Sequence, residues 1–470
     1  MKKIIVKIFV SFFLFLCLGI NSVLAQNRWD SLAGASKNPE NLGVIYADSN
    51  YIYAAGSYTV VGGIPMNNIA RWNGVKWDSM GGGIGGITFN PSAASAFATY
   101  HNKLYVGGIF GSLGNVLAVS LGTWDGVVWD SIPIQPFKDD NDKGVGAMAV
   151  INDKLYIGGI FDTVAGQPNV FDIACWNGIN WSSLNFPNLR NFEFIDALCE
   201  YNGSIYAAGD FYGNVNDTIG NILRWDGTSW HSVGGGITDG DYISSMVVYN
   251  GALYVAGLFS KSDGDVGNNI QRWDGTSWSD VGGGTDYQIF SLLVYKSKLY
   301  ALGNFDEAGG VPATSIAEWD GSKWCGLGDT FNNSIISGCV YKDSLYIGGG
   351  FGTIDSKSTG DMAEWVGGSY VSACGNDATS VNEPIAKSEE VSAYPNPSNG
   401  SFTLSLSNIN AAYTVEIYNV LGEKVYTETL PQNPSNNTIN LTGQPSGVYL
   451  YRVLKESGEL VGSGKLAIEK

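Results

Sequence analysis

The sequence predicts an all-β protein, in which a seven-bladed β-propeller with four strands per blade precedes a small immunoglobulin-like β-sandwich. The composition supports this class, because the 470 residues include 63 glycines and 13% aromatic residues but only 15% charged residues. A strand pattern that recurs seven times, at spacings of 46 to 52 residues, predicts the blades. Short alternating strands after the last repeat predict the sandwich.

The first 25 residues have the features of a secretory signal peptide. Lys2, Lys3 and Lys7 give a basic start, and a nearly unbroken apolar run follows at residues 8–20. Ala25 then completes a small-residue cleavage site. We expect residues 1–25 to be removed during export, and no later segment is apolar enough to predict a transmembrane span.

Two patterns define each repeat. The first is an apolar strand with glycine near its end and an aromatic residue after it, at residues 52–58, 104–110, 155–161, 205–211, 253–259, 299–305 and 345–351. The second is Trp-Asn/Asp-Gly-x-x-Trp, at residues 72–77, 124–129, 176–181, 225–230, 273–278 and 319–324, with a last copy at 365–370 that ends in tyrosine. Asn-Gly and Asp-Gly favour tight turns, so the fifth repeat predicts strands at 243–249, 252–259, 269–273 and 277–281.

A separate copy of the fourth strand lies near the N-terminus. Trp29-Asp30-Ser31 matches the start of the fourth strand at Trp77, and we expect it to join the last blade and close the ring. All 14 tryptophans fall in this pattern. Their common register predicts that they form core between the blades, and ligand stacking is the alternative.

Residues 27–373 resemble known propeller repeats. A strand ending in Gly-Gly, followed by two aromatic residues a few positions apart, resembles the kelch-type repeat. The tryptophan form of the pattern is similar to repeats in exported Bacteroidota surface proteins and in fungal cortical-marker proteins. The resemblance implies the same propeller fold, which we place at residues 26–375.

The composition changes after the last repeat. Residues 376–391 are small, polar or charged and predict a linker, and residues 392–470 predict a second domain. A turn cluster at 394–400 begins this domain. Alternating strands are predicted at 401–406, 414–418, 424–429, 437–441, 447–454 and 464–468.

The second domain closely resembles the type A C-terminal sorting domain of the Bacteroidota type IX secretion system. The matching motif residues are Tyr394, Pro395, Asn396, Pro397, Gly400, Tyr418, Asn419, Gly422, Gly447 and Tyr449. The resemblance implies that the type IX secretion machinery is a partner. It also implies removal of this domain and then release or attachment to surface lipopolysaccharide. The alternative is an ordinary immunoglobulin-like accessory domain.

Charge and residue counts exclude several functions. The net charge of −18 disfavours binding to nucleic acid. The two histidines, His101 and His231, are predicted in a turn and a rim strand, so we assign no catalytic or metal-ligand role to them. The pairing of the cysteines left after cleavage stays open, and these are Cys175, Cys199, Cys325, Cys339 and Cys374.

The candidate binding surface is the face that carries the loops from strand two to three and from strand four to one. We call it the long-loop face; its loops are predicted to be long, irregular and acidic, and the acidic residues assigned to them include Asp210, Asp329 and Asp361. Loops on a rigid scaffold commonly bind ligands. The predicted binding residues are Asp239, Asp241, Asp263, Asp265, Asp306 and Glu307. The alternatives are a solvated surface, or calcium at the loops 139–144 and 262–267.

These observations predict an exported cell-surface or secreted binding or adhesion module, for which a surface glycan or a protein is the ligand. No cofactor is expected. The alternative is a hydrolase or lyase that acts on polysaccharide through carboxylates of the long-loop face. Such an enzyme would carry polar residues that break the repeat near the axis, and none stands out in the sequence.

Overall fold

The computed structural model describes the chain in two compact units, Met1–Gly375 and Asn376–Lys470. It describes residues 29–32, 42–57, 60–61, 64–86, 93–135, 144–168, 170–187, 189, 191–212, 220–237, 242–260, 266–366, 373–374, 391–406, 412–419, 423–431, 438–455 and 460–470. All regular elements in these ranges are strands, so the all-β prediction is confirmed. The predicted signal peptide lies outside the described residues. No helix in the described ranges is long and apolar enough to cross a membrane.

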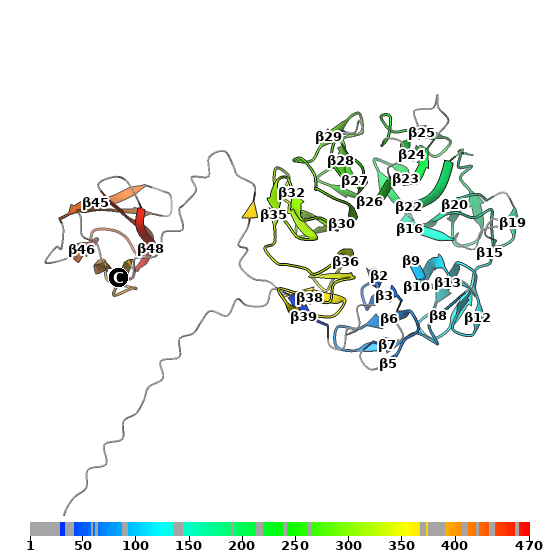
Figure 1. Ribbon diagram of the computed structural model, residues 1–470, viewed down its shortest axis with the longest axis horizontal. Coiled ribbons are helices and arrows are strands. Elements are labelled where there is room, and N and C mark those ends of the chain that lie inside the picture. The colour runs from blue at the N-terminus through cyan, green and yellow to red at the C-terminus, as the bar shows by residue number, and fades with distance from the viewer. Residues whose placement is uncertain are drawn as a thin grey trace, which may run out of the picture. The chain divides into compact units, whose positions relative to one another are not determined.

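Seven sheets of the first unit, which we call blades, each contain four antiparallel strands; these follow in sequence order in blades one to six, whereas the outermost strand of blade seven comes from residues 29–31. Their first strands lie innermost and contact one another in a closed cycle (Figure 1). These inner strands are β2 (Leu42–Ala47), β9 (Ala93–Tyr100), β16 (Val145–Ile151), β22 (Asn191–Tyr201), β26 (Tyr242–Tyr249), β30 (Ile289–Tyr295) and β36 (Ile335–Tyr341). The first unit is therefore a ring of blades.

The second strands carry the glycines of the repeat. They are β3 (Ile52–Gly56), β10 (Lys103–Ile109), β17 (Lys154–Gly159), β23 (Ser204–Tyr212), β27 (Ala252–Leu258), β31 (Lys298–Gly303) and β37 (Ser344–Gly349). A Cβ atom on Gly107 would lie 2.6 Å from atoms of both Met148 and Val145 in the next blade. Glycine at this position therefore permits the close approach of two blades.

The third and fourth strands form the outer half of each blade and carry the tryptophan pairs. The third strands are β6 (Ile69–Trp72), β13 (Leu121–Trp124), β20 (Ile173–Trp176), β24 (Gly220–Trp225), β28 (Ile270–Trp273), β34 (Ile316–Trp319) and β40 (Met362–Trp365). The fourth are β7 (Trp77–Ser79), β14 (Trp129–Ser131), β21 (Trp181–Ser183), β25 (Trp230–Ser232), β29 (Trp278–Asp280) and β35 (Trp324–Gly326), with β1 (Trp29–Ser31) in blade seven.

The tryptophans join neighbouring blades. Trp319 and Trp324 pack with ring centroids 5.3 Å apart, and they are 6% and 2% exposed. The indole nitrogen of Trp324 donates a hydrogen bond of 2.7 Å to the carbonyl oxygen of Val281 in the preceding blade. Trp129 makes the same bond to Met80. The tryptophans are core residues, as the sequence predicted.

The Asn/Asp-Gly dipeptides form the turns between strands three and four. One carboxylate oxygen of Asp274 accepts hydrogen bonds of 2.8 Å from the backbone N–H groups of Thr276 and Ser277. Gly275 has a φ of +102°, which favours glycine. Together these two residues account for the recurring dipeptide at the turn.

The long loops are more regular than the sequence predicted. Between strands two and three, five blades carry a two-stranded hairpin: β4 (Val60–Val61) with β5 (Ile64–Pro65), β11 (Ser112–Leu113) with β12 (Val116–Leu117), β18 (Thr163–Val164) with β19 (Gln167–Pro168), β32 (Glu307–Ala308) with β33 (Val311–Pro312), and β38 (Thr353–Ile354) with β39 (Lys357–Ser358). β8 (Ile84–Gly85) and β15 (Ile134–Gln135) pair with two of these hairpins from the loops after strand four. The prediction of irregular loops is wrong here, because the loops hydrogen-bond to one another.

Both ends of the first unit return to the ring. β1 pairs with β40, which confirms the predicted closure by the N-terminal strand. β41 (Ala373–Cys374) adds a fifth strand to blade six, with Cys374 opposite Cys325 of β35. Cys325 is in a disulfide bond. Three other cysteines are free, namely Cys175, Cys199 and Cys339.

The second unit consists of two sheets. One contains β42 (Val391–Tyr394), β43 (Ser401–Leu406) and β46 (Thr438–Asn440); the other contains β44 (Tyr413–Asn419), β45 (Lys424–Leu430), β47 (Gly447–Lys455) and β48 (Leu460–Ile468). Residues of both sheets, such as Phe402 and Val453, share one core. β42 was not predicted as a strand, because its residues were assigned to the end of the linker and the turn cluster. It pairs with β43.

Candidate functional site

His231, which was predicted on a rim strand, does not form a catalytic triad. Ser229 and Asp226 both contact the same ring nitrogen of His231, Nε2, at 3.0 and 2.7 Å. A triad needs the acid and the nucleophile on opposite ring nitrogens. The carboxylate of Asp226 also accepts the backbone N–H groups of its own turn. These side chains therefore stabilise the turn between β24 and β25.

Two of the six predicted binding residues lie in the described part of the chain. Asp306 and Glu307 are exposed at the start of the β32–β33 hairpin. The other four, Asp239, Asp241, Asp263 and Asp265, lie outside the described residues, as does most of each predicted calcium loop. No group of three or more residues that could hold a metal ion occurs within the described ranges.

Asp286 fixes the backbone of this hairpin. One of its carboxylate oxygens accepts hydrogen bonds of 3.0 Å from the N–H groups of both Asp306 and Glu307. In blade seven the side-chain oxygen of Asn332 accepts the equivalent bonds from Gly352 and Thr353. Because an uncharged residue does the same work there, Asp286 is a structural residue. The side chains of Asp306 and Glu307 remain available to a ligand.

Other carboxylates of the long-loop face are buried. Asp329 is 6% exposed and Asp361 is 3% exposed, although the sequence placed both in solvent-facing loops. Asp329 accepts a hydrogen bond of 3.0 Å from the indole nitrogen of Trp29. Because both residues are buried, the prediction that Asp329 and Asp361 lie on a solvated surface is wrong.

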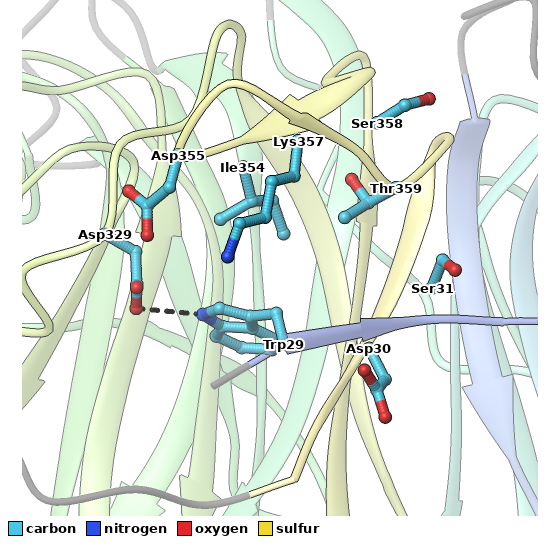
Figure 2. A pocket seen from close by; sticks show the side chains of 9 residues that line it. All are labelled: Trp29, Asp30, Ser31, Asp329, Ile354, Asp355, Lys357, Ser358 and Thr359. Atoms are coloured by element: carbon cyan, nitrogen blue, oxygen red, sulfur yellow. Dashed lines mark hydrogen bonds between the residues drawn. The ribbon is translucent and has the colours of Figure 1, made fainter. Parts of the chain in front are cut away.

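A cleft of about 90 Å³ surrounds this hydrogen bond. It lies between β1 and the β38–β39 hairpin, and the side chain of Lys357 reaches into it toward Trp29 and Asp329 (Figure 2). The remaining lining residues are Asp30, Ser31, Ile354, Asp355, Ser358 and Thr359. Since the buried hydrogen bond between Trp29 and Asp329 joins the N-terminal strand to the ring, we assign this cleft to ring closure.

A second polar site lies on the inner strands. Each inner strand leaves a residue unpaired at an equivalent β-bulge, and the seven residues at this position are Gly43, Ser95, Gly146, Asp196, Ser244, Phe290 and Ile336. Only Asp196 carries a charge. β22 also has a further register shift, between Phe192 and Phe194. This additional bulge distinguishes blade four from the other blades. Because β-bulges are frequent beside active sites, blade four is a candidate position for a functional site.

Asp196 lies in a half-buried group of polar residues. Burial, and then the nearby carboxylate of Asp210, raises the pKa of Asp196 to about 7. The pKa of Tyr242 in blade five is also raised, chiefly by burial and then by Asp196. The side-chain amide of Gln288 in blade six donates a hydrogen bond to the hydroxyl of Tyr242. We call Asp196, Asp210, Tyr242 and Gln288 the axial cluster.

The axial cluster lies where the inner strands of blades four to six meet the long-loop face. Tyr242 is the first residue of β26, Gln288 directly precedes β30, and Asp210 lies near the end of β23. The sequence did not predict this site, and Asp210, which was assigned to a loop, lies in β23. Alignment of the seven inner strands on their bulges is the signal that reveals Asp196.

The ring of four-stranded blades and the β-sandwich define an all-β protein of the propeller type. Residues 392–469 match the family model described as the secretion system C-terminal sorting domain. The predicted sorting domain is therefore confirmed, and the protein is delivered to the cell surface or secreted by the type IX system. No curated protein matches the chain.

Solved structures provide distant likenesses. One is PorZ, a bacterial surface component of the type-IX secretion system of Porphyromonas gingivalis, with 15% identity and a TM-score of 0.46. The alignment covers 91% of this chain and 59% of PorZ. The extracellular domain of a one-component system from B. thetaiotaomicron has 13% identity and a TM-score of 0.45, covering 94% of this chain and 57% of that one. The chain thus spans less than two thirds of either relative.

Proposed function

We propose that the exported ring is a binding module whose ligand occupies the axial cluster in blades four to six. The observation that carries this proposal is Asp196, a half-buried carboxyl at a position where the six other blades have an uncharged residue. A half-buried acid that the fold does not require is a candidate for function, because burial of a charge is costly.

The chemistry of the cluster favours a ligand that donates hydrogen bonds. Asp196 and Asp210 present carboxyl oxygens, and Gln288 is held in place by Tyr242. Hydroxyl groups of a glycan or amino groups of a protein meet this requirement. We place the outer part of the same site at Asp239, Asp241, Asp263, Asp265, Asp306 and Glu307, on the loops of blades four to six.

A glycan array tests the proposal, with the wild-type protein beside Asp196→Ser. Serine occupies the equivalent bulge in blades two and five, so this variant keeps the fold. We expect its binding to fall at least tenfold, while Ser95→Ala, at the bulge of blade two, binds like the wild type. Equal binding by all three proteins would remove the axial cluster from the site.

The second candidate function is cleavage of a polysaccharide. It is favoured by the raised pKa of Asp196 beside Asp210, since a carboxyl that holds its proton near neutral pH suits a general acid. Incubation with polysaccharides separates the two functions. An enzyme loses cleavage but keeps binding in Asp196→Asn, whereas a binding module releases no product in the wild type.

We also propose the domain limits given by the sequence. The mature propeller spans residues 26–375, residues 376–391 are a linker, and the sorting domain spans residues 392–470. The division into compact units after Gly375 supports these limits. Limited proteolysis that cuts within 376–391 and leaves two stable fragments is the expected result.

A further inference from the structure

The outer face of the sheet β45-β44-β47-β48 in the sorting domain exposes apolar side chains. Along β47, Tyr449, Tyr451 and Val453 point into the core and are at most 5% exposed. Alternation therefore places Val448 and Leu450 on the outer face. They are 48% and 45% exposed.

These side chains belong to a continuous strip. Leu450 lies between Tyr418 of β44 and Lys465 of β48, and Val448 lies opposite Ala467. The turn after β42 continues the strip, because the side chain of Asn396 bonds to both Lys465 and Ala467 of β48, each at 2.8 Å.

Tyr394, which ends β42 just before this turn, is 56% exposed. We call Tyr394, Tyr418, Val448 and Leu450 the apolar strip.

Cations border the strip. Arg452 and Lys424 both bind the carboxylate of Glu416 and lie 5.2 and 5.9 Å from the ring centre of Tyr418. The hydrogen bond from Lys424 is the main cause of the lowering of the Glu416 pKa to about 2. Lys465 adds a third cation beside Leu450. A protein with a net charge of −18 thus has a locally basic border here.

The other exposed parts of this unit are polar. On the sheet β42-β43-β46, Thr403 and Thr438 face each other with hydroxyl oxygens 3.4 Å apart. At the far end of β44 and β45, Thr414 and Thr429 form a similar pair at 3.0 Å. Among the described residues of this unit, the exposed aliphatic side chains are Val448 and Leu450.

Several residues of the sorting motif make contacts within the domain itself. Asn419 bonds to Glu423 through its backbone and side chain and closes the turn between β44 and β45. The hydroxyl of the buried Tyr449 donates a hydrogen bond of 2.9 Å to the Pro445 carbonyl oxygen. Gly400 has a φ of +98°, and a Cβ atom on it would lie 2.9 Å from the Leu441 oxygen. These three residues shape the domain, whereas Tyr394 and Tyr418 of the same motif belong to the strip.

We propose that the apolar strip is the surface through which the sorting domain docks on a protein of the type IX apparatus. The matched partner surface is apolar with carboxylates along its border, complementary to Lys424, Arg452 and Lys465. The occupant follows from the place of the strip, since all of its residues lie within the sorting-domain match at 392–469. Exposed apolar patches on a small domain commonly mark protein interfaces.

The test uses the full chain with Val448→Thr and Leu450→Thr together, produced in a host that has the apparatus. Threonine suits a strand, so the sandwich stays folded. We expect surface delivery to fall at least tenfold, with the folded protein retained in the periplasm. The matched control is Thr403→Ser with Thr438→Ser on the other sheet, which should be delivered normally.

Normal delivery of the double threonine variant would overturn the proposal. If the oligomeric state of the purified variant, measured by sedimentation, also changes, the strip contacts a second copy of the chain. Lys465→Glu gives an independent check that keeps the apolar residues, and we expect it to reduce delivery because it repels a carboxylate on the partner.

Discussion

Trp29 lies directly opposite Trp365, with indole centroids 4.9 Å apart, although the two residues come from opposite ends of the propeller sequence. The indole nitrogen of Trp29 donates a hydrogen bond to Asp329, 300 residues further along the chain. Blade seven is therefore complete only when the N-terminal strand is in place. Closure of this kind supplies blade seven with the short outer strand that the other blades also have.

Replacement of Trp29 should destabilise the whole ring. Trp29→Ala removes a side chain that is 4% exposed, and we expect a loss of about 3–5 kcal/mol. Asp329→Ala should cost about 1–3 kcal/mol, because a buried indole N–H loses an acceptor. Urea unfolding measures both, and Asp30→Ala on the exposed side of β1 is the control. An unchanged midpoint for Trp29→Ala would show that blade seven folds without β1.

The disulfide of Cys325 should stabilise the C-terminal end of the first unit. β41 brings Cys374 opposite Cys325, so Cys325→Ser and Cys374→Ser should each cost about 2–4 kcal/mol. The double variant should cost no more than either single variant. Cys199→Ser, at a free thiol, is the control. Additive losses in the thermal unfolding of the double variant would mean that Cys325 has another partner.

Asp286 should tolerate loss of its charge but not loss of its oxygen. Asp286→Asn keeps the acceptor that Asn332 supplies in blade seven, so its stability should stay within about 0.5 kcal/mol of the wild type. Asp286→Ala leaves two N–H groups without this acceptor and should cost about 1 kcal/mol. Urea unfolding compares the two variants. Equal losses would mean that the charge itself holds the hairpin.

The blades were predictable because their chemistry repeats. Each Asn/Asp-Gly turn and each pair of tryptophans specifies the same local structure, and seven copies make the period visible. The hairpins in the long loops were not predictable, since strands of two residues have no periodicity. Their partners also lie in other loops, as for β8 and β11.

The axial cluster was hidden for a different reason. A bulge shifts the pairing of a strand by one residue, so the position of Asp196 is defined by its partner strand and not by sequence spacing. Asp329 was misplaced because its burial depends on Trp29, which arrives from the other end of the chain. The sorting domain was predicted from its motif, yet the strand β42 was not, because it begins at the last residue of the predicted linker and ends at the first residue of the turn cluster.

The stability of the ring should fall as the pH rises through about 7, because of Asp196. Its pKa is about 7 in the folded protein, against an ordinary value of 3.8, since burial and Asp210 disfavour its charge. The folded state therefore holds a proton that the unfolded state releases between these values. The contribution of this proton to the free energy of unfolding is complete below about pH 3.8 and is lost by about pH 7. The total loss between these pH values is on the order of 4 kcal/mol.

Asp196→Asn tests this linkage, because asparagine has a similar shape and does not ionise. The variant should match the wild type near pH 4 and exceed its stability by several kcal/mol at pH 8. Urea unfolding at a series of pH values gives the difference, and Ser244→Asn controls for an amide at the equivalent bulge. If the two curves run parallel from pH 4 to 8, Asp196 ionises normally, and the axial cluster loses the proton on which the general-acid role depends.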